Sequence, residues 1–251
     1  MIEIANLTKT FGIATAVDHL NLSIGAGELF AFIGPNGAGK TTTIKMVTGL
    51  LRPTEGQVHL CGYNVQTDYI RAKSLLSYVP DEPYLYDKLT GREFLRFVGT
   101  MYGLPRNVTD SGIAQLGEQF SLGDFLDELG ETYSHGMKQR VVISAALLHG
   151  PKVLVVDEPL VGLDPEGAST LKGALRERAQ QGVTVFISTH TLTLAEEIAD
   201  RVGIIHHGRL IALGSLDHIR QEARTDGRLE DAFLTLTGEQ TTSGSSAVMG
   251  A

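Results

Sequence analysis

The fold of this chain is decided by residues 34–42, which read Gly34-Pro35-Asn36-Gly37-Ala38-Gly39-Lys40-Thr41-Thr42. The apolar run Leu29–Ile33 precedes this stretch and predicts a buried strand, and residues 41–50 favour a helix. The spacing matches G-x-x-x-x-G-K-[ST], a phosphate-binding loop. A glycine-rich turn with a lysine by chance is the alternative, and the strand and helix at the required places argue against it.

Each residue type in this loop has a chemical task. Glycines let backbone N–H groups approach phosphate oxygens without a Cβ clash, and the positive end of the next helix favours anions. Lys40 adds a positive charge for the β- and γ-phosphates. The Thr41 hydroxyl is suited to complete a Mg²⁺ shell of waters and phosphate oxygens. The sequence therefore predicts that the chain binds a nucleoside triphosphate together with Mg²⁺.

The composition is that of a soluble globular protein. Of its 251 residues, 42% are hydrophobic and 20% are charged, which suits one large domain or a core with a subdomain. No run approaches the roughly 18 apolar residues of a spanning helix, and the N-terminus lacks a signal pattern, so we expect a cytoplasmic protein. The single cysteine, Cys61, excludes an internal disulfide. The net charge of -8 argues against a nucleic-acid partner.

Two further apolar runs end in polar side chains. Residues 152–156 predict a central parallel strand, and Asp157 and Glu158 follow it. Because open α/β sheets bind ligands at the carboxyl ends of their strands, we expect Asp157 to hold Mg²⁺ and Glu158 to polarise the attacking water. An ordinary polar strand end is the alternative. Residues 183–187 predict another such strand, and His190 after it is a candidate γ-phosphate sensor at the same edge.

The middle of the chain, from about residue 82 to residue 150, is predicted to be helical. Residues 90–93 have the form of a capping box, and a second helix is expected over residues 112–120. Ser134 predicts the N-cap of a further helix. Its hydroxyl and the N–H of Gly136 at that helix N-terminus would form a second phosphate site, although the pattern is also that of a simple capped helix.

Two other residues have both a structural and a functional interpretation. Asp164 precedes Pro165 and is suited to cap a helix that runs to about residue 181, which is a sufficient role by itself. Phe11 lies before the predicted strands and could stack on an adenine ring. A phenylalanine near a strand end is more often part of the core.

The order of these motifs resembles that of the ATP-binding subunit of ABC transporters. The resemblance covers residues 2–214, and it rests on the phosphate loop, the Ser-x-Gly helix, the apolar strand with Asp-Glu, residues 162–164 and the strand-end histidine. It implies an α/β fold: a RecA-like P-loop NTPase core with an antiparallel β subdomain and an inserted helical subdomain. It also implies two such domains that pair head to tail, with each ATP between the phosphate loop of one and the Ser-x-Gly motif of the other.

The resemblance assigns roles residue by residue. Phe11 would stack on adenine, Glu158 would be the catalytic base, and His190 would be the switch on the γ-phosphate. Ser134 would reach the γ-phosphate bound by the partner, and Asp164 would make a contact across the dimer. The implied nucleotide-binding residues are Phe11, Gly34, Pro35, Asn36, Gly37, Ala38, Gly39, Lys40, Thr41, Thr42, Ser134, Gly136 and Asp164.

Three positions depart from the family pattern. His135 stands where the family motif L-S-G-G-Q has its first glycine, and if its ring faces the partner's nucleotide, its protonation would add a phosphate contact. Solvent exposure of the ring is the alternative. Asp81 stands where the family has a glutamine; a carboxylate suits a hard cation, so Asp81 joins Thr41 and Asp157 in the expected Mg²⁺ site unless it merely begins a turn. Val161 replaces a common serine.

The resemblance also implies the partners. We expect a peripheral subunit at the cytoplasmic face of a membrane, bound to a separate multi-span permease and to a second ATPase subunit, identical or homologous. Residues 84–89 carry tyrosines and leucines that suit a docking patch for the permease or the core of the helical subdomain. The competing hypothesis is a soluble ABC-type ATPase that acts on ribosomes or DNA. A P-loop kinase is a third, and it leaves the Ser-x-Gly helix unexplained.

The expected boundaries follow from these motifs. The ATPase domain should cover residues 1–219, with the helical subdomain at about 82–150. A short C-terminal helical segment is expected over residues 220–237. The serine- and threonine-rich end, residues 238–251, is expected to be a disordered tail.

Overall fold

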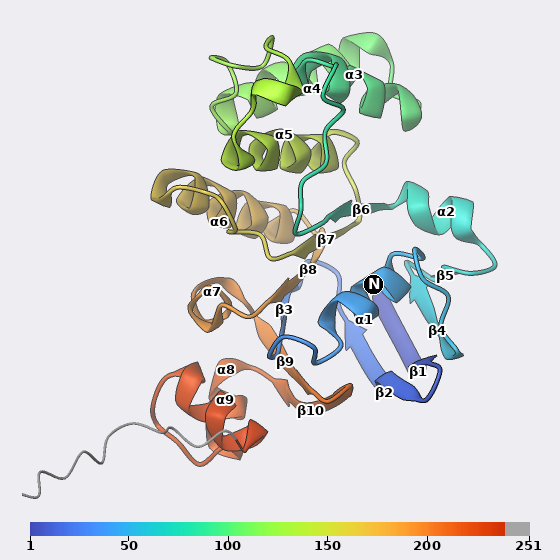
Figure 1. Ribbon diagram of the computed structural model, residues 1–251, viewed down its shortest axis with the longest axis vertical. Coiled ribbons are helices and arrows are strands. Elements are labelled where there is room, and N and C mark those ends of the chain that lie inside the picture. Colours follow the sequence, from blue (N-terminus) through green and yellow to red (C-terminus); the bar gives the residue numbers. More distant parts are fainter. Residues whose placement is uncertain (239–251) are drawn as a thin grey trace, which may run out of the picture.

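The computed structural model describes residues 1–238 (Figure 1). Two β-sheets form the centre of the molecule, and a group of helices lies beyond one end of the larger sheet. No helix within residues 1–238 is long and apolar enough to cross a membrane. Apart from Gly238, the predicted disordered tail lies outside the described residues.

The larger sheet has six strands in the order β10-β9-β3-β8-β7-β6. Neighbouring strands from β9 to β6 are parallel, and β10 is antiparallel to β9. Every residue of β3, β7 and β8 is buried, which explains why these strands are apolar runs without alternation. Their parallel order confirms the predicted α/β core. The strands are β3 (Leu29–Ile33), β6 (Leu76–Val79), β7 (Val153–Asp157), β8 (Thr184–Thr189), β9 (Arg201–His206) and β10 (Arg209–Gly214).

The smaller sheet is antiparallel, with the order β2-β1-β4-β5. Helix α1 (Lys40–Val47) lies between the two sheets in Figure 1 and buries Ile44, Met46 and Val47 in the core that they share. In this core the ring of Phe30, on the strand that leads into the phosphate loop, stacks on the ring of Phe186 with centroids 5.6 Å apart. The strands are β1 (Ile2–Phe11), β2 (Ala14–Ile24), β4 (Glu55–Leu60) and β5 (Tyr63–Asn64).

The helical group is an excursion of the chain between two neighbouring strands of the larger sheet, β6 and β7. Helices α3 and α4 pack on each other and on α5, and α5 leads back to β7. The predicted capping box of α3 is present, since the Thr90 hydroxyl accepts from the N–H of Glu93 and the Glu93 carboxylate accepts from the N–H of Thr90. The helices are α3 (Gly91–Met101), α4 (Arg106–Gln119) and α5 (His135–Leu148), with a short 3₁₀ turn at Gly130–Thr132.

Helix α4 begins earlier than the sequence pattern predicts. The expected start is residue 112, and the first helical residue is Arg106. The buried face consists of Thr109, Ile113 and Leu116, at helical spacing. Because the first of these is polar, the apolar periodicity does not reach the first two turns.

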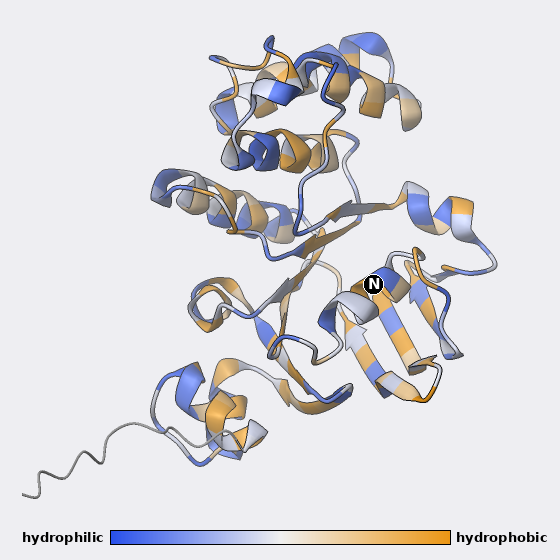
Figure 2. Ribbon diagram, viewed as in Figure 1, coloured by the Kyte–Doolittle hydropathy of each residue, from blue (hydrophilic) through white to orange (hydrophobic). Residues whose placement is uncertain are grey.

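The remaining helices lie on both sides of the larger sheet. Helix α6 begins after the predicted cap Asp164, whose carboxylate accepts from the N–H of Gly167 at 2.9 Å. Helices α8 and α9 cover the β9–β10 end. Figure 2 shows orange strands at the centre and helices that carry both orange and blue residues. These helices are α2 (Tyr69–Ser74), α6 (Pro165–Gln180), α7 (Leu192–Ile198), α8 (Leu216–Glu222) and α9 (Leu229–Thr237).

Candidate functional site

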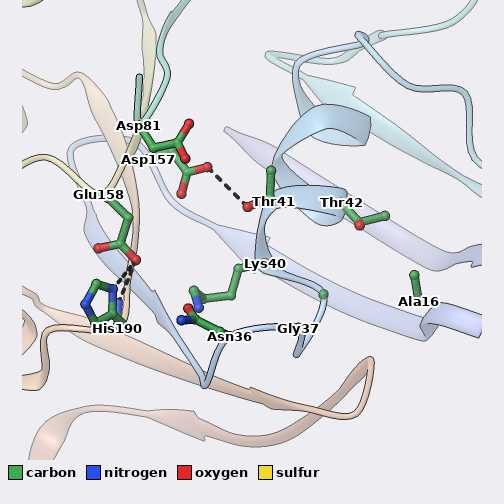
Figure 3. Close-up of a pocket in the computed structure, with 11 residues that line it drawn as sticks. Ala16, Asn36, Gly37, Lys40, Thr41, Thr42, Asp81, Asp157, Glu158 and His190 are labelled. Carbon is green, nitrogen blue, oxygen red and sulfur yellow. Dashed lines mark hydrogen bonds and ion pairs between the residues drawn. The ribbon is translucent and has the colours of Figure 1, made fainter. Parts of the chain in front are cut away.

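A cleft of about 280 Å³ opens at the carboxyl edge of the parallel strands, where the phosphate loop, β7 and β8 end (Figure 3). This is the edge at which open α/β sheets bind ligands. The structure therefore brings together side chains that the sequence places more than a hundred residues apart. The cleft is lined by Ala16, Asn36, Gly37, Gly39, Lys40, Thr41, Thr42, Asp81, Asp157, Glu158 and His190.

The phosphate loop connects the end of β3 to the first residue of α1, Lys40. The Lys40 ammonium is buried and donates to the carbonyl oxygens of Gly34 at 2.6 Å and Pro35 at 3.1 Å. Burial lowers the pKa of this lysine. The positive end of α1 and the ammonium thus point into one small space, an arrangement that suits an anion. Gly34, Pro35 and Ala38 form the frame of the loop and do not line the cleft.

The candidate metal ligands lie beside α1. The Thr41 hydroxyl is 3.5 Å from a carboxylate oxygen of Asp157, at the end of β7, and Asp81 lies next to this pair (Figure 3). Burial raises the pKa of Asp157, so a cation beside it would stabilise its ionised form. These oxygen donors suit Mg²⁺. Within residues 1–238 no three acidic, histidine or cysteine side chains form a metal site.

The catalytic candidates Glu158 and His190 are in direct contact. One oxygen of Glu158 accepts from the N–H of His190 at 2.9 Å and from its Nδ1 at 2.7 Å, and the other accepts from the Thr189 hydroxyl at 2.9 Å. Since a carboxylate only accepts, Nδ1 carries a proton and the Nε2 atom is left for another partner. The backbone of Glu158 is held at φ 46°, a sparsely populated region. The structure therefore fixes the orientation of both side chains.

Besides the three frame residues of the loop, four predicted nucleotide-binding residues from other segments do not line the cleft. Ser134 is exposed and caps α5, where its hydroxyl accepts from the N–H of Met137 at 3.3 Å. Gly136 follows it in the first turn of α5, and Asp164 is bound to the N–H of Gly167 and to Arg140. Phe11 is 53% exposed. Ser134, Gly136 and Asp164 therefore contribute nothing to the cleft of their own chain.

The departure from the family motif at His135 has a visible structural consequence. Its ring covers Gly162 of the same chain, where a Cβ atom would overlap Cδ2 of the histidine and lie 2.9 Å from Cγ and Nε2. Gly162 has φ 79°. One helical turn later, Arg140 donates to the Asp164 carboxylate at 2.9 Å. Helix α5 and the loop after Glu158 are therefore packed together in one chain.

Sequence reasoning missed two residues of the site. Ala16, on β2, lines the cleft although nothing in its sequence surroundings marks it. Thr189 orients Glu158 through its hydroxyl, and it also accepts from the N–H of Thr191 at 2.9 Å. The position of Thr189, between the strand end and His190, is a signal that would have identified it.

Comparisons with known proteins agree with this geometry. A family model described as "ABC transporter" matches residues 17–161. The probable multidrug ABC transporter ATP-binding protein YbhF of Escherichia coli (strain K12) is 36% identical over 240 residues, covering 94% of this chain and 41% of YbhF. The chain thus spans about two fifths of the length of that relative. The linearmycin resistance ATP-binding protein LnrL of Bacillus subtilis (strain 168) is 38% identical over 215 residues, covering 86% of this chain and 69% of LnrL.

A solved structure is similar over nearly the whole chain. It is the structure of an ATP-binding subunit of an ABC transporter, with a TM-score of 0.90 and 33% sequence identity. The alignment covers 94% of this chain and 99% of that one.

Proposed function

Because the chain belongs to the ABC transporter family, we propose that it is the subunit that binds and hydrolyses ATP to power export across a membrane. The cleft at the carboxyl edge of the larger sheet is the observation that carries this proposal. Lys40, Thr41, Asp157 and Glu158 converge there with His190.

The phosphate loop and Lys40 would bind the triphosphate. The Lys40 ammonium donates to two neutral carbonyl oxygens. Phosphate oxygens would replace these acceptors because hydrogen bonds between charged groups are roughly twice as strong as neutral ones. Thr41 and Asp157 would hold Mg²⁺, directly or through water, with Asp81 beside them. When bound, Mg²⁺ neutralises charge that develops on the β- and γ-phosphate oxygens.

Glu158 would act as the general base for the attacking water. Its carboxylate is held by Thr189 and His190, so that it need not reorient when the water arrives. The Nδ1 atom of His190 donates to the carboxylate, and Nε2 would donate to a γ-phosphate oxygen when it also carries a proton. The pair would then put a proton acceptor and a phosphate contact next to each other.

A second copy of the chain, or a homologous subunit, would complete the site. Ser134, Gly136 and Asp164 carry polar groups at exposed or half-exposed positions outside the cleft. The hydroxyl and N–H groups at the N-terminus of α5 suit a phosphate of the partner's nucleotide. ATP would then favour the closed dimer by contacting both subunits, and hydrolysis would release it.

The permease would dock on the helical group. An apolar groove of about 320 Å³ lies between β6 and helices α3 and α5, and its lining includes Tyr84, Phe94 and Tyr102. Tyr84 is 69% exposed and packs edge-on against Tyr86, while Leu85 between them is buried. The predicted segment 84–89 therefore contributes both an exposed patch and a core contact. Exposed aromatic side chains around a groove are typical of a protein partner.

The proposed location is the cytoplasmic face of a membrane. The names of two relatives, which refer to multidrug transport and to linearmycin resistance, favour a role in export. No specific observation favours the alternative, a soluble ATPase acting on ribosomes or DNA, and the net charge of -8 argues against a nucleic-acid surface.

The test is ATP-dependent dimerisation of the Glu158→Gln variant, measured by size exclusion with Mg²⁺. A dimer that forms with ATP and is lost when Ser134→Arg is added supports the shared site. The Ser134→Arg variant should still bind ATP as a monomer, which separates loss of pairing from loss of binding. Failure of wild-type protein to bind ATP would overturn the proposal. Co-expression with the membrane protein of the neighbouring gene tests the permease partner through co-purification.

A further inference from the structure

The turn between β9 and β10, residues 207–208, packs directly behind the phosphate loop. The N–H of Gly208 donates to the carbonyl oxygen of Ala38 at 2.9 Å, and the carbonyl oxygen of Gly208 accepts from the N–H of Asp18 at 2.9 Å. The turn therefore joins the phosphate loop to β2 through main-chain hydrogen bonds. These two contacts bridge residues that lie 170 to 190 positions apart in the sequence.

Gly208 fits this place because it has no side chain. Its φ is 77°, and a Cβ atom there would lie 2.9 Å from the carbonyl oxygen of Ala16. On the other side, a Cβ atom at Gly39 of the phosphate loop would lie 2.5 Å from the same oxygen. The Ala16 carbonyl is thus enclosed between two glycines, one in the phosphate loop and one in the turn. Real Cβ atoms do not approach a main-chain oxygen so closely, and a main-chain oxygen cannot move aside as a flexible side chain can.

The hydrogen bond to Ala38 sets the direction of a group in the cleft. Ala38 is buried, and its own N–H donates to the Pro35 carbonyl at 3.2 Å. The carbonyl of Ala38 and the N–H of Gly39 belong to the same planar trans peptide, in which they point in opposite directions. When Gly208 holds the carbonyl on one side, the N–H of Gly39 points to the other side, away from the turn. Gly39 is one of the residues that line the cleft.

We propose that Gly208 is a positioning residue for ATP binding, which holds the Ala38–Gly39 peptide in the orientation that phosphate oxygens require. Gly208 does not line the cleft and acts through Ala38. The inference rests on the nucleotide binding proposed above. It adds the C-terminal hairpin of the larger sheet to the parts of the chain that determine ATP affinity.

The experiment compares Gly208→Ala with a matched glycine variant, Gly62→Ala. Gly62 lies in the turn between β4 and β5 and has φ 84°. A Cβ atom there would meet no heavy atom within 4 Å. Alanine at position 62 therefore has the same left-handed backbone strain as alanine at position 208 but collides with nothing. Both variants are checked by thermal melting, and the dissociation constant of a fluorescent ATP analogue is then measured with Mg²⁺. We expect Gly208→Ala to bind about tenfold more weakly than wild type, the effect of losing one hydrogen bond to a charged group, and Gly62→Ala to bind like wild type.

A second variant covers the case in which Gly208→Ala does not fold. His207 is exposed and has φ 47°, so His207→Gly relaxes the turn without adding any atom. We expect a weaker analogue affinity, by about twofold to fivefold, with little change in melting temperature. If a folded Gly208→Ala binds the analogue as tightly as wild type, or if Gly208→Ala does not fold and His207→Gly binds as tightly as wild type, Gly208 has no positioning role. If the wild-type protein itself does not bind the analogue, the proposed ATPase function is wrong. This result differs from one in which wild type binds and the variants bind equally well, which refutes only the role of Gly208.

Discussion

Replacing Glu158 with glutamine removes the proposed general base and preserves its surroundings. One carboxylate oxygen accepts two hydrogen bonds from His190, and the other accepts one from the Thr189 hydroxyl. The glutamine carbonyl can take the place of the first oxygen. Its NH₂ group then faces the hydroxyl oxygen of Thr189, which can accept as well as donate. The substitution therefore removes the ability to take a proton while keeping a hydrogen-bonding group against both His190 and Thr189.

The expected magnitude follows from that geometry. General-base catalysis contributes about 10²- to 10⁴-fold to a rate, or about 3–5 kcal/mol of the barrier at 1.36 kcal/mol per tenfold. Since the three hydrogen bonds can be retained, we expect the melting temperature to change by less than about 4 °C, the effect of roughly 1 kcal/mol in a chain of this size. The assay is phosphate release at saturating ATP and Mg²⁺, together with the affinity for ATP, which should be unchanged.

The matched control is Glu118→Gln, which removes an exposed carboxylate on α4. Glu118 does not line the cleft. It should hydrolyse ATP at the wild-type rate. If Glu158→Gln retains more than about a tenth of the wild-type rate, the loss of rate is smaller than general-base catalysis would account for. Another group must then accept the proton, and the role given to Glu158 is wrong.

Three other predictions concern the loop after Glu158, the half-buried His149 and the metal site. Gly162→Ala should lower the free energy of unfolding by at least about 1 kcal/mol because alanine disfavours the left-handed backbone there, and overlap with the His135 ring should lower it further. Adding His135→Gly removes that ring and should restore part of the loss. A double variant no more stable in urea than Gly162→Ala would contradict this. Burial lowers the pKa of His149 to about 4. Between about pH 6.5, the usual histidine pKa, and about pH 4, the unfolded chain therefore binds a proton that the folded chain does not. The free energy of unfolding should fall by about 1–2 kcal/mol over this range. The fall is smaller than for a fully buried ring because solvent partly screens His149. Urea titrations at several pH values should show a shallower fall for His149→Phe, and equal slopes would refute the assignment. Asp81→Gln should shift the Mg²⁺ concentration needed for hydrolysis more than it shifts the ATP affinity, because it removes a negative charge beside Asp157; an unchanged Mg²⁺ titration would count against Asp81 as part of the metal site.

The local motifs can be predicted from the sequence because each is specified by neighbouring residues. Thr90, Ser134 and Asp164 all cap the helices that their sequence surroundings predict, since an N-cap needs only its own side chain and the next turn. The parallel strands that end at Asp157 and Thr189 are also recognisable, because strands buried on both faces are continuous apolar runs.

The contacts between distant segments cannot be predicted in this way. The sequence leaves the ring of His135 facing either the partner's nucleotide or solvent. In the structure His135 is exposed, as the second alternative has it, and its ring also lies against Gly162 of its own chain. The turn at Gly208 carries no recognisable sequence signal, because its role depends on Ala38 and Ala16, which approach it only in the folded chain. Periodicity reports which face of an element is buried, and it does not report which segment covers that face.

The helices between β6 and β7 serve two different needs of the chain: α5 fixes the position of Ser134, and α3 and α4 form the outer part of the helical group. Helix α5 is the segment that returns to the larger sheet, and Ser134 caps its first turn, so the position of this serine is tied to β7. Helices α3 and α4 pack on α5 and on each other. If the permease docks on the helical group as proposed, changes of sequence on the exposed faces of α3 and α4 would alter the choice of membrane partner without displacing the serine.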